Sequence, residues 1–125
     1  MQSQMMARAA YSTQNTPIRT PRGTEYDVVA RVTQRLRAAA LLGRSGFPAL
    51  AEAVHTNRRL WTMLAADVAD RDNPLPRDLK ARIFYLSEFT RDYSGRVLSK
   101  GASVAPLLEI NAAVMRGLRA GGVAE

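Results

Sequence analysis

Hydrophobic positions between residues 24 and 118 recur at spacings of three and four, and turn-forming residues divide them into four segments. This spacing places one apolar stripe along each of four helices. The strict alternation of a half-buried strand is absent from these segments. The pattern therefore predicts an all-α fold, a small four-helix bundle with short loops.

The first helix is predicted over residues 24–42. Thr24 suits the N-cap and Asp27 the carboxylate position of a capping box. Gly43 is suited to a left-handed end, and the turn follows at Ser45 and Gly46. The buried stripe is expected to consist of Val29, Val32, Leu36 and Ala39 or Ala40.

The second helix is predicted to begin at Phe47 and Pro48 and to carry a regular seam with one polar member, Asn57. The seam comprises Leu50, Val54, Asn57, Trp61, Leu64 and Val68, with Leu60 and Met63 widening it. A buried Asn57 would cost about 1–3 kcal/mol unless its amide were hydrogen-bonded. If it is buried and bonded to a neighbouring helix, it fixes packing. If it lines an open groove, it is a candidate for contact with a partner.

The third helix is predicted after the turn Asn73–Pro76, with Pro76 in its first position. Its main face is expected to comprise Leu79, Ile83, Leu86, Tyr93 and Val97, with Phe84, Tyr85, Phe89 and Leu98 around it. Aromatic residues at helical spacing usually belong to a core. A helix that is apolar nearly all round is either central in its bundle or presents a second face to a partner.

The fourth helix is predicted to be capped by Ser103 and to turn Leu107, Ile110 or Asn111, Val114 and Leu118 inward. Residues 24–118 thus form the predicted helical domain. Residues 1–23 are polar and turn-rich and are predicted to be a flexible N-terminal arm. Residues 119–125 are predicted to be a frayed tail.

Composition narrows the class of protein. With 125 residues and 46% hydrophobic side chains, the chain supports one domain with a real core. It has no cysteine, no signal-peptide core and no stretch of membrane-spanning length, so a cytoplasmic protein without membrane insertion is expected. The net charge of +7 is spread along the chain without a dense basic run. Direct nucleic-acid binding is therefore not expected.

No set of residues has the pattern of a catalytic, cofactor or metal site. His55 is the lone histidine and is expected to be solvated. Asp67, Asp70 and Asp72 lack the glycine and the glutamate of a calcium loop, because Leu75 and Ala81 occupy those positions. The sequence indicates a non-enzymatic protein.

The main motif of the chain runs from Asn57 to Asp67 (NRRLWTMLAAD) and continues at Asn73–Pro76 (NPLP). Further motifs are Pro21-Arg22 and Glu25-Tyr26 upstream, and Leu86–Phe89, Arg96–Leu98, Ile110-Asn111 and Val114–Leu118 downstream. In their order and spacing these motifs together resemble the FlaF family of alphaproteobacterial flagellar proteins, and the likeness spans residues 11–118.

The resemblance implies a cytoplasmic, non-enzymatic regulator of flagellin synthesis and secretion. A flagellin-binding export chaperone fits the small helical bundle with surplus apolar surface. The alternative is a post-transcriptional regulator that acts on flagellin messenger RNA directly or through a second regulator, FlbT.

Five residues are candidates for contact with a partner: Asn57, Trp61, Tyr85, Phe89 and Asn111. Flagellin is the expected partner, with FlbT as a second. Exchange of Trp61 or Tyr85 for alanine is expected to weaken a flagellin complex without unfolding the bundle.

Overall fold

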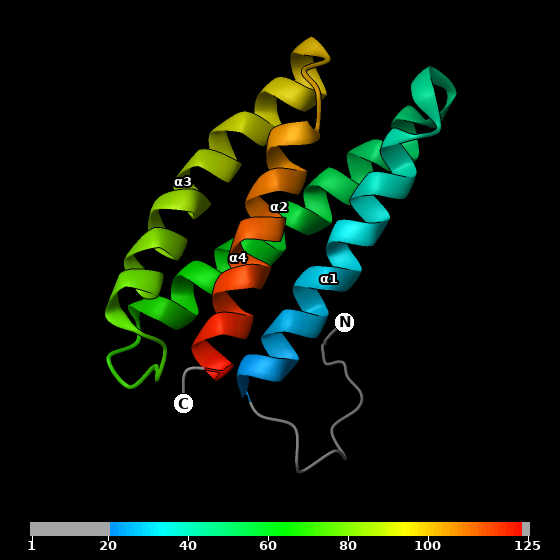
Figure 1. Ribbon diagram of the computed structural model, residues 1–125. Helices are drawn as coiled ribbons and strands as arrows, with labels where there is room; N and C mark the ends of the chain where they lie inside the picture. Colours follow the sequence, from blue (N-terminus) through cyan, green and yellow to red (C-terminus); the bar gives the residue numbers. More distant parts are fainter. Residues whose placement is uncertain (1–20, 124–125) are drawn as a thin grey trace.

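Four α-helices and one short 3-10 helix make up residues 21–123, the part of the chain that the computed structural model describes; side chains are described for residues 25–120 (Figure 1). The helices are α1 (Pro21–Ala40), α2 (Phe47–Ala69), α3 (Arg77–Lys100) and α4 (Ala105–Val123), with the 3-10 helix η1 (Gly43–Gly46) before α2. The prediction of a small all-α four-helix bundle is confirmed.

The ends of α1 differ from the prediction. The helix begins at Pro21, three residues before Thr24, because proline fits the first turn of a helix. It ends at Ala40, and a turn then leads to Gly43, whose φ of 71° is the left-handed conformation expected there. Of the predicted arm, residues 1–20 lie outside the described part of the chain.

The loop between α3 and α4 contains the predicted cap at Ser103 and, in addition, a glycine cap at Gly101. Gly101 ends α3 with a φ of 69°, and the Ser103 hydroxyl accepts a hydrogen bond from the Ala105 N–H at 3.0 Å. Pro76 is the N-cap of α3 instead of its first residue. At the other end, α4 continues to Val123, so the helix extends past residue 118, where the helical domain was predicted to end.

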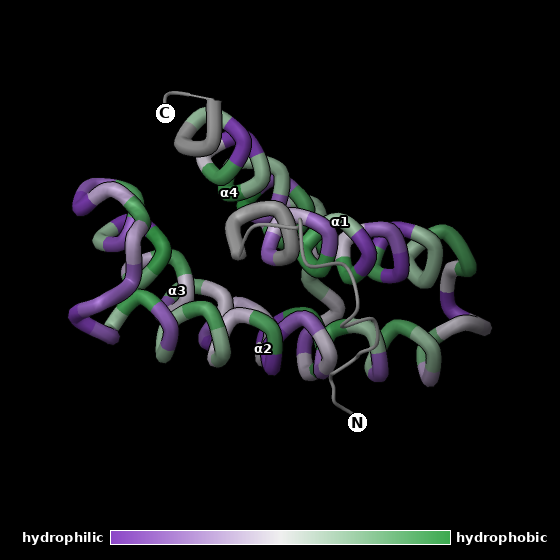
Figure 2. The backbone as a smooth tube through the Cα atoms, turned by 90° about the horizontal axis from the view of Figure 1, so that it is seen from below, coloured by the Kyte–Doolittle hydropathy of each residue, from purple (hydrophilic) through white to green (hydrophobic). Residues whose placement is uncertain are grey.

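The helices run up and down in succession, and α3 lies at one edge of the bundle (Figure 1). α1 packs against both α2 and α4, whereas α3 packs mainly against α2 and touches α4 less. Viewed from below, α3 lies beside α2 and far from α1 (Figure 2). Much of the surface of α3 is therefore not covered by another helix.

The core is divided into two apolar clusters with polar residues between them. The cluster near the start of α1 comprises Val29, Val32, Leu60, Trp61, Leu64, Val68, Leu75, Ile83, Val114 and Leu118. The cluster near the end of α1 comprises Leu36, Ala39, Ala53, Val54, Val97, Val104 and Leu107. Along every helix the buried polar residues fall between these clusters. We call Thr33, Asn57, Thr90, Ser94 and Asn111 the central polar layer.

The predicted seam is confirmed for α2, but for α3 it is confirmed only at Ile83 and Val97. In α2 the residues from Val54 to Val68 of the seam are buried, although Met63 is exposed. In α3 the buried seam is Ile83, Ser87, Thr90, Ser94 and Val97. Leu86 and Tyr93 lie on one flank and are only half-buried. Small hydroxyl side chains therefore occupy the face of α3 that approaches α2.

No helix in the described part of the chain is long and apolar enough to span a bilayer.

Candidate functional site

Asn111 joins three helices at the centre of the molecule. Its Oδ1 accepts a hydrogen bond from Trp61 Nε1 at 2.8 Å. Its Nδ2 donates to Asn57 Oδ1 at 2.8 Å and to Thr33 Oγ1 at 3.0 Å. Asn111 and Asn57 are completely buried, and Trp61 is 1% exposed. This network connects α4 to α1 and α2 through side chains alone.

Three of the five predicted contact residues therefore lie in the interior: Asn57, Trp61 and Asn111. Of the two alternatives for Asn57, the first holds, because its carbonyl is bonded to α4 and lines no open groove. A buried polar residue that can be satisfied in only one arrangement favours that helix register over others. We assign the central polar layer to packing.

The half of the central polar layer on α3 is not satisfied. Asn57 Nδ2, Thr90 Oγ1 and Ser94 Oγ are buried and have no hydrogen-bond partner within the described residues. A buried polar group without a partner costs about 1–3 kcal/mol. The contact between α2 and α3 is therefore weakened at mid-height.

We expect Thr90→Val to raise the free energy of unfolding by about 1 kcal/mol, because it removes an unpaired buried hydroxyl at almost constant volume. Thr33→Val is the matched control. The Thr33 hydroxyl donates to the Val29 carbonyl at 2.6 Å and accepts from Asn111, so its loss should lower the same quantity. Urea denaturation measures both variants. Destabilisation by Thr90→Val would show that its hydroxyl has a partner.

The other two predicted residues, Tyr85 and Phe89, are on the surface of α3. Tyr85 is 71% exposed and Phe89 40%. The Phe89 ring stacks on that of Tyr93, with centroids 5.5 Å apart and planes 12° apart. Tyr93 is half-buried, and its hydroxyl donates to the Ser103 carbonyl at 2.6 Å. These three aromatic residues, spaced by four, form a row along α3 that we call the aromatic ladder.

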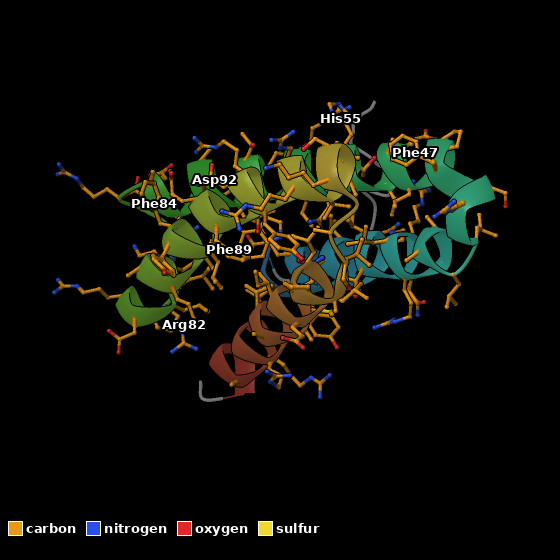
Figure 3. All side chains as sticks on the ribbon, turned by 90° about the horizontal axis from the view of Figure 1, so that it is seen from above. Phe47, His55, Arg82, Phe84, Phe89 and Asp92 are labelled. Atoms are coloured by element: carbon orange, nitrogen blue, oxygen red, sulfur yellow. The ribbon has the colours of Figure 1, made fainter. Side chains whose placement is uncertain are left out.

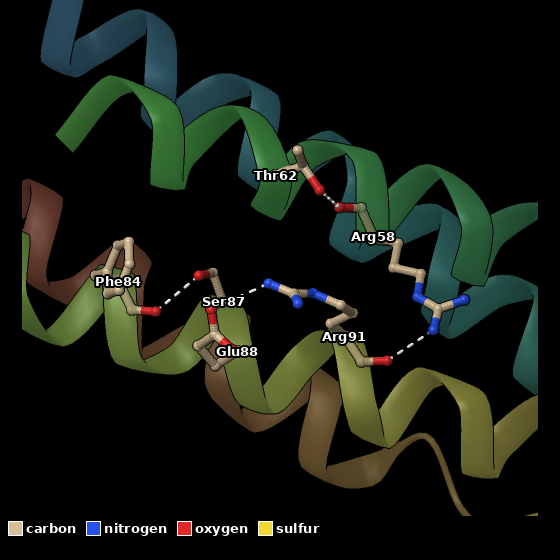
Figure 4. Close-up of polar contacts among 6 residues, drawn as sticks. All are labelled: Arg58, Thr62, Phe84, Ser87, Glu88 and Arg91. Carbon is tan, nitrogen blue, oxygen red and sulfur yellow. Dashed lines mark hydrogen bonds and ion pairs between the residues drawn. The ribbon is translucent and has the colours of Figure 1, made fainter. Parts of the chain in front are cut away.

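Phe84 is also exposed, but it lies on a different side of α3 from Phe89 (Figure 3). The two positions are five residues apart, which corresponds to about 140° around a helix. On the Phe84 side, Arg58 of α2 donates from Nη2 to the Arg91 carbonyl of α3 at 2.8 Å (Figure 4). Phe84 is therefore separate from the aromatic ladder.

The acidic turn after α2 is held by local hydrogen bonds. Asp70 Oδ1 accepts from the Asp72 N–H, and Asn73 Oδ1 accepts from the Leu75 N–H, each at 2.9 Å. Lys80 donates to the Asn73 carbonyl at 3.2 Å. Within the described part of the chain no group of three or more histidine, aspartate or glutamate residues could hold a metal ion. These polar groups shape the turn and bring the buried Leu75 into the core.

Burial, and then the neighbouring charge of Asp70, raise the pKa of Asp67 above its ordinary value of 3.8. The folded state thus binds this proton more tightly than the unfolded state, so the charged form opposes folding at neutral pH. We expect Asp67→Asn to raise the free energy of unfolding at pH 7 by up to about 0.5 kcal/mol, since Asp67 is an exposed residue whose carboxylate is only partly desolvated. The gain should vanish as the pH falls below the ordinary pKa. Urea denaturation across this pH range checks it, and a gain that persists in acid would contradict the assignment.

His55 lies exposed on the outer side of α2 (Figure 3), as the sequence predicted.

Four buried polar residues were not predicted from the sequence: Thr33, Ser87, Thr90 and Ser94. A signal for three of them is present, because Ile83, Ser87, Thr90, Ser94 and Val97 follow one another at spacings of four and three. That spacing is as regular as the seam of α2. Hydrophobicity alone favoured Leu86 and Tyr93 instead.

One protein family matches this chain. The family model described as flagellar protein FlaF matches residues 7–118. No curated protein and no solved structure matched. The match covers both halves of the central polar layer and the aromatic ladder, and it begins inside the predicted N-terminal arm. The chain belongs to the FlaF family of flagellar proteins.

Proposed function

We propose that this protein is a cytoplasmic, non-enzymatic chaperone that binds flagellin before export and so promotes flagellin synthesis and secretion. Membership of a flagellar family supports a role in the flagellum. Binding in place of catalysis agrees with the residues described above, whose polar groups serve packing and turn formation.

The observation that carries the proposal is that α3 exposes aromatic side chains while small hydroxyl side chains occupy the middle of its buried face. Its buried seam contains Ser87, Thr90 and Ser94, whereas Tyr85 and Phe89 are exposed. A helix with large apolar side chains on its outer surface offers a partner a face to bind. Aromatic residues are also the commonest energetic anchors of protein interfaces.

The aromatic ladder fits an amphipathic helix as its occupant. Tyr85, Phe89 and Tyr93 present a row of rings one helical turn apart, and Tyr93 is fixed by its bond to Ser103. An apolar stripe on a client helix, repeating at three and four residues, can pack along such a row. The amphipathic terminal segments of flagellin would provide this stripe.

Calorimetric titration with purified flagellin tests the proposal. We expect a stoichiometric complex at micromolar concentrations, and the double variant Tyr85→Ala/Phe89→Ala should weaken it at least ~10-fold. Phe84→Ala is the matched control, because it removes an equally large exposed ring on a different side of α3. Its affinity should equal that of the unaltered protein.

The absence of heat with unaltered protein would reject flagellin binding. Equal weakening by Phe84→Ala and by the double variant would reject the aromatic ladder as the contact. Denaturation curves of all variants establish that each is folded under the titration conditions.

Action on flagellin messenger RNA, directly or through FlbT, is the alternative function, and the net charge of +7 favours a polyanionic partner. The affinity for RNA would fall steeply as the salt concentration rises, because the release of counterions from the RNA then contributes less to binding. Binding to FlbT would instead be found by co-purification without RNA. A flagellin complex that forms in the absence of both supports the chaperone proposal.

A further inference from the structure

A hydrophobic tip lies at the corner between α1 and α2. Leu41 is 81% exposed, and Leu42 and Phe47 are exposed as well. We call these three residues the corner tip. The corner projects at one end of the bundle (Figure 1), and Phe47 lies on the outside of α2 close to it (Figure 3). Large apolar side chains gathered on a surface mark a contact site more often than single ones do.

The exposure of the corner tip follows from an ordered turn. The Leu42 N–H donates to the Ala39 carbonyl at 3.2 Å, and the Ser45 hydroxyl donates to the Leu42 carbonyl at 3.3 Å. Gly43 supplies the left-handed φ, and a side chain at Gly46 would collide with Leu42. The backbone of this corner therefore holds the two leucines in place, away from the core.

The end of the molecule that carries the corner tip has more basic than acidic side chains, although Glu52 and Glu109 are exposed about one helical turn after the starts of α2 and α4. Residues 28–51 contain no aspartate or glutamate, and Arg35, Arg37 and Arg44 are exposed there. Residues 93–108 also contain no acid, and Arg96 and Lys100 are exposed. The up-and-down course of the helices brings both segments to the same end (Figure 1). The acidic turn after α2 lies at the opposite end.

We propose that this end docks on an anionic membrane surface, with the corner tip inserted among the lipid headgroups. Apolar side chains surrounded by arginine have the chemistry of an interfacial anchor, because burial and attraction to anionic lipids add together. Two of the three tip residues are aliphatic, whereas binding of single-stranded nucleic acid relies on aromatic stacking. The sequence-based expectation of no membrane insertion rested on helix length, which concerns spanning and not contact at the interface.

This surface is independent of the proposed flagellin contact. The corner tip belongs to α1 and α2, and the aromatic ladder belongs to α3. One molecule therefore has the surfaces to hold a client helix and rest on a membrane together.

Co-sedimentation of the full chain with vesicles tests the proposal. Vesicles of phosphatidylcholine containing phosphatidylglycerol should bind it at least ~10-fold more tightly than phosphatidylcholine alone. Leu41→Ser/Leu42→Ser should reduce this binding at least ~10-fold, and so should Arg35→Gln/Arg37→Gln/Arg44→Gln. Met63→Ser, which alters an exposed apolar residue elsewhere on α2, is the matched control and should bind unchanged.

Insertion has its own signal in a Phe47→Trp variant. Trp61 is buried and gives a constant background, so a blue shift with anionic vesicles reports that position 47 has entered the lipid. No binding, equal binding to both vesicle types, or full binding by the double serine variant would overturn the proposal. It would also be overturned by a lipid-free dimer that Leu41→Ser dissociates, or by a preference for RNA over anionic vesicles. None of these outcomes bears on the flagellin titration.

Discussion

Asn111→Ala should lower the free energy of unfolding by about 3–5 kcal/mol, because it breaks every side-chain bond in the network that joins α4 to α1 and α2. The exchange leaves the Trp61 N–H and the Asn57 carbonyl buried without a partner. Each such group costs about 1–3 kcal/mol. The total is a large part of the free energy of unfolding of a typical domain, which is roughly 5–15 kcal/mol.

Urea denaturation followed by circular dichroism measures this loss. Glu109→Ala, which alters an exposed residue two positions away on the same helix, is the control and should change stability by less than about 0.5 kcal/mol. A loss below about 1 kcal/mol for Asn111→Ala would mean that water or a shift of α4 satisfies the remaining groups.

The fold of this chain is predictable from its sequence because the central polar layer interrupts the apolar stripes of α1, α2 and α4 at only one position each. In α1, α2 and α4 the apolar residues flanking Thr33, Asn57 and Asn111 keep the helical spacing on both sides of the layer. A single polar residue does not disturb such a pattern. The stripes, and the Gly43 and Ser103 signals between them, were therefore readable from the residues alone.

The face of α3 could not be predicted in the same way. Its buried positions Ser87, Thr90 and Ser94 carry almost no hydrophobic signal, and the strong signal of Tyr85 and Phe89 lies on the outside. The largest apolar residues are usually expected in the core, because burial stabilises them most. That expectation fails for α3, where Tyr85 is 71% and Phe89 40% exposed.

The five predicted contact residues also separate into buried and exposed ones. Tyr85 and Phe89, predicted as contacts because they are aromatic, are exposed, whereas Asn57, Trp61 and Asn111, which lie in the family motifs, are buried. A single sequence does not separate the buried members of such a set from the exposed ones. Only the distances from Asn111 to its partners on other helices make the separation.

Trp61→Ala should lower the free energy of unfolding by about 3–5 kcal/mol, because it removes the largest fully buried side chain and leaves a cavity. It also deprives the buried Asn111 Oδ1 of its donor. Trp61→Phe is the matched control. It keeps most of the volume, so the lost hydrogen bond dominates and the cost should be about 1–3 kcal/mol. Urea denaturation of both variants separates the cost of the lost volume from the cost of the lost hydrogen bond.

The expected loss of stability changes how weakened flagellin binding by Trp61→Ala should be interpreted. The sequence suggested that this exchange would leave the bundle folded, but a fully buried tryptophan acts on stability first. The apparent affinity of a partly unfolded protein falls in proportion to its folded fraction. We therefore expect the flagellin affinity of Trp61→Ala, corrected for the folded fraction, to equal that of the unaltered protein. Tyr85→Ala should show the opposite combination, with unchanged stability and weakened binding. Weakened binding by fully folded Trp61→Ala would instead show that α2 moves to expose this residue to the client.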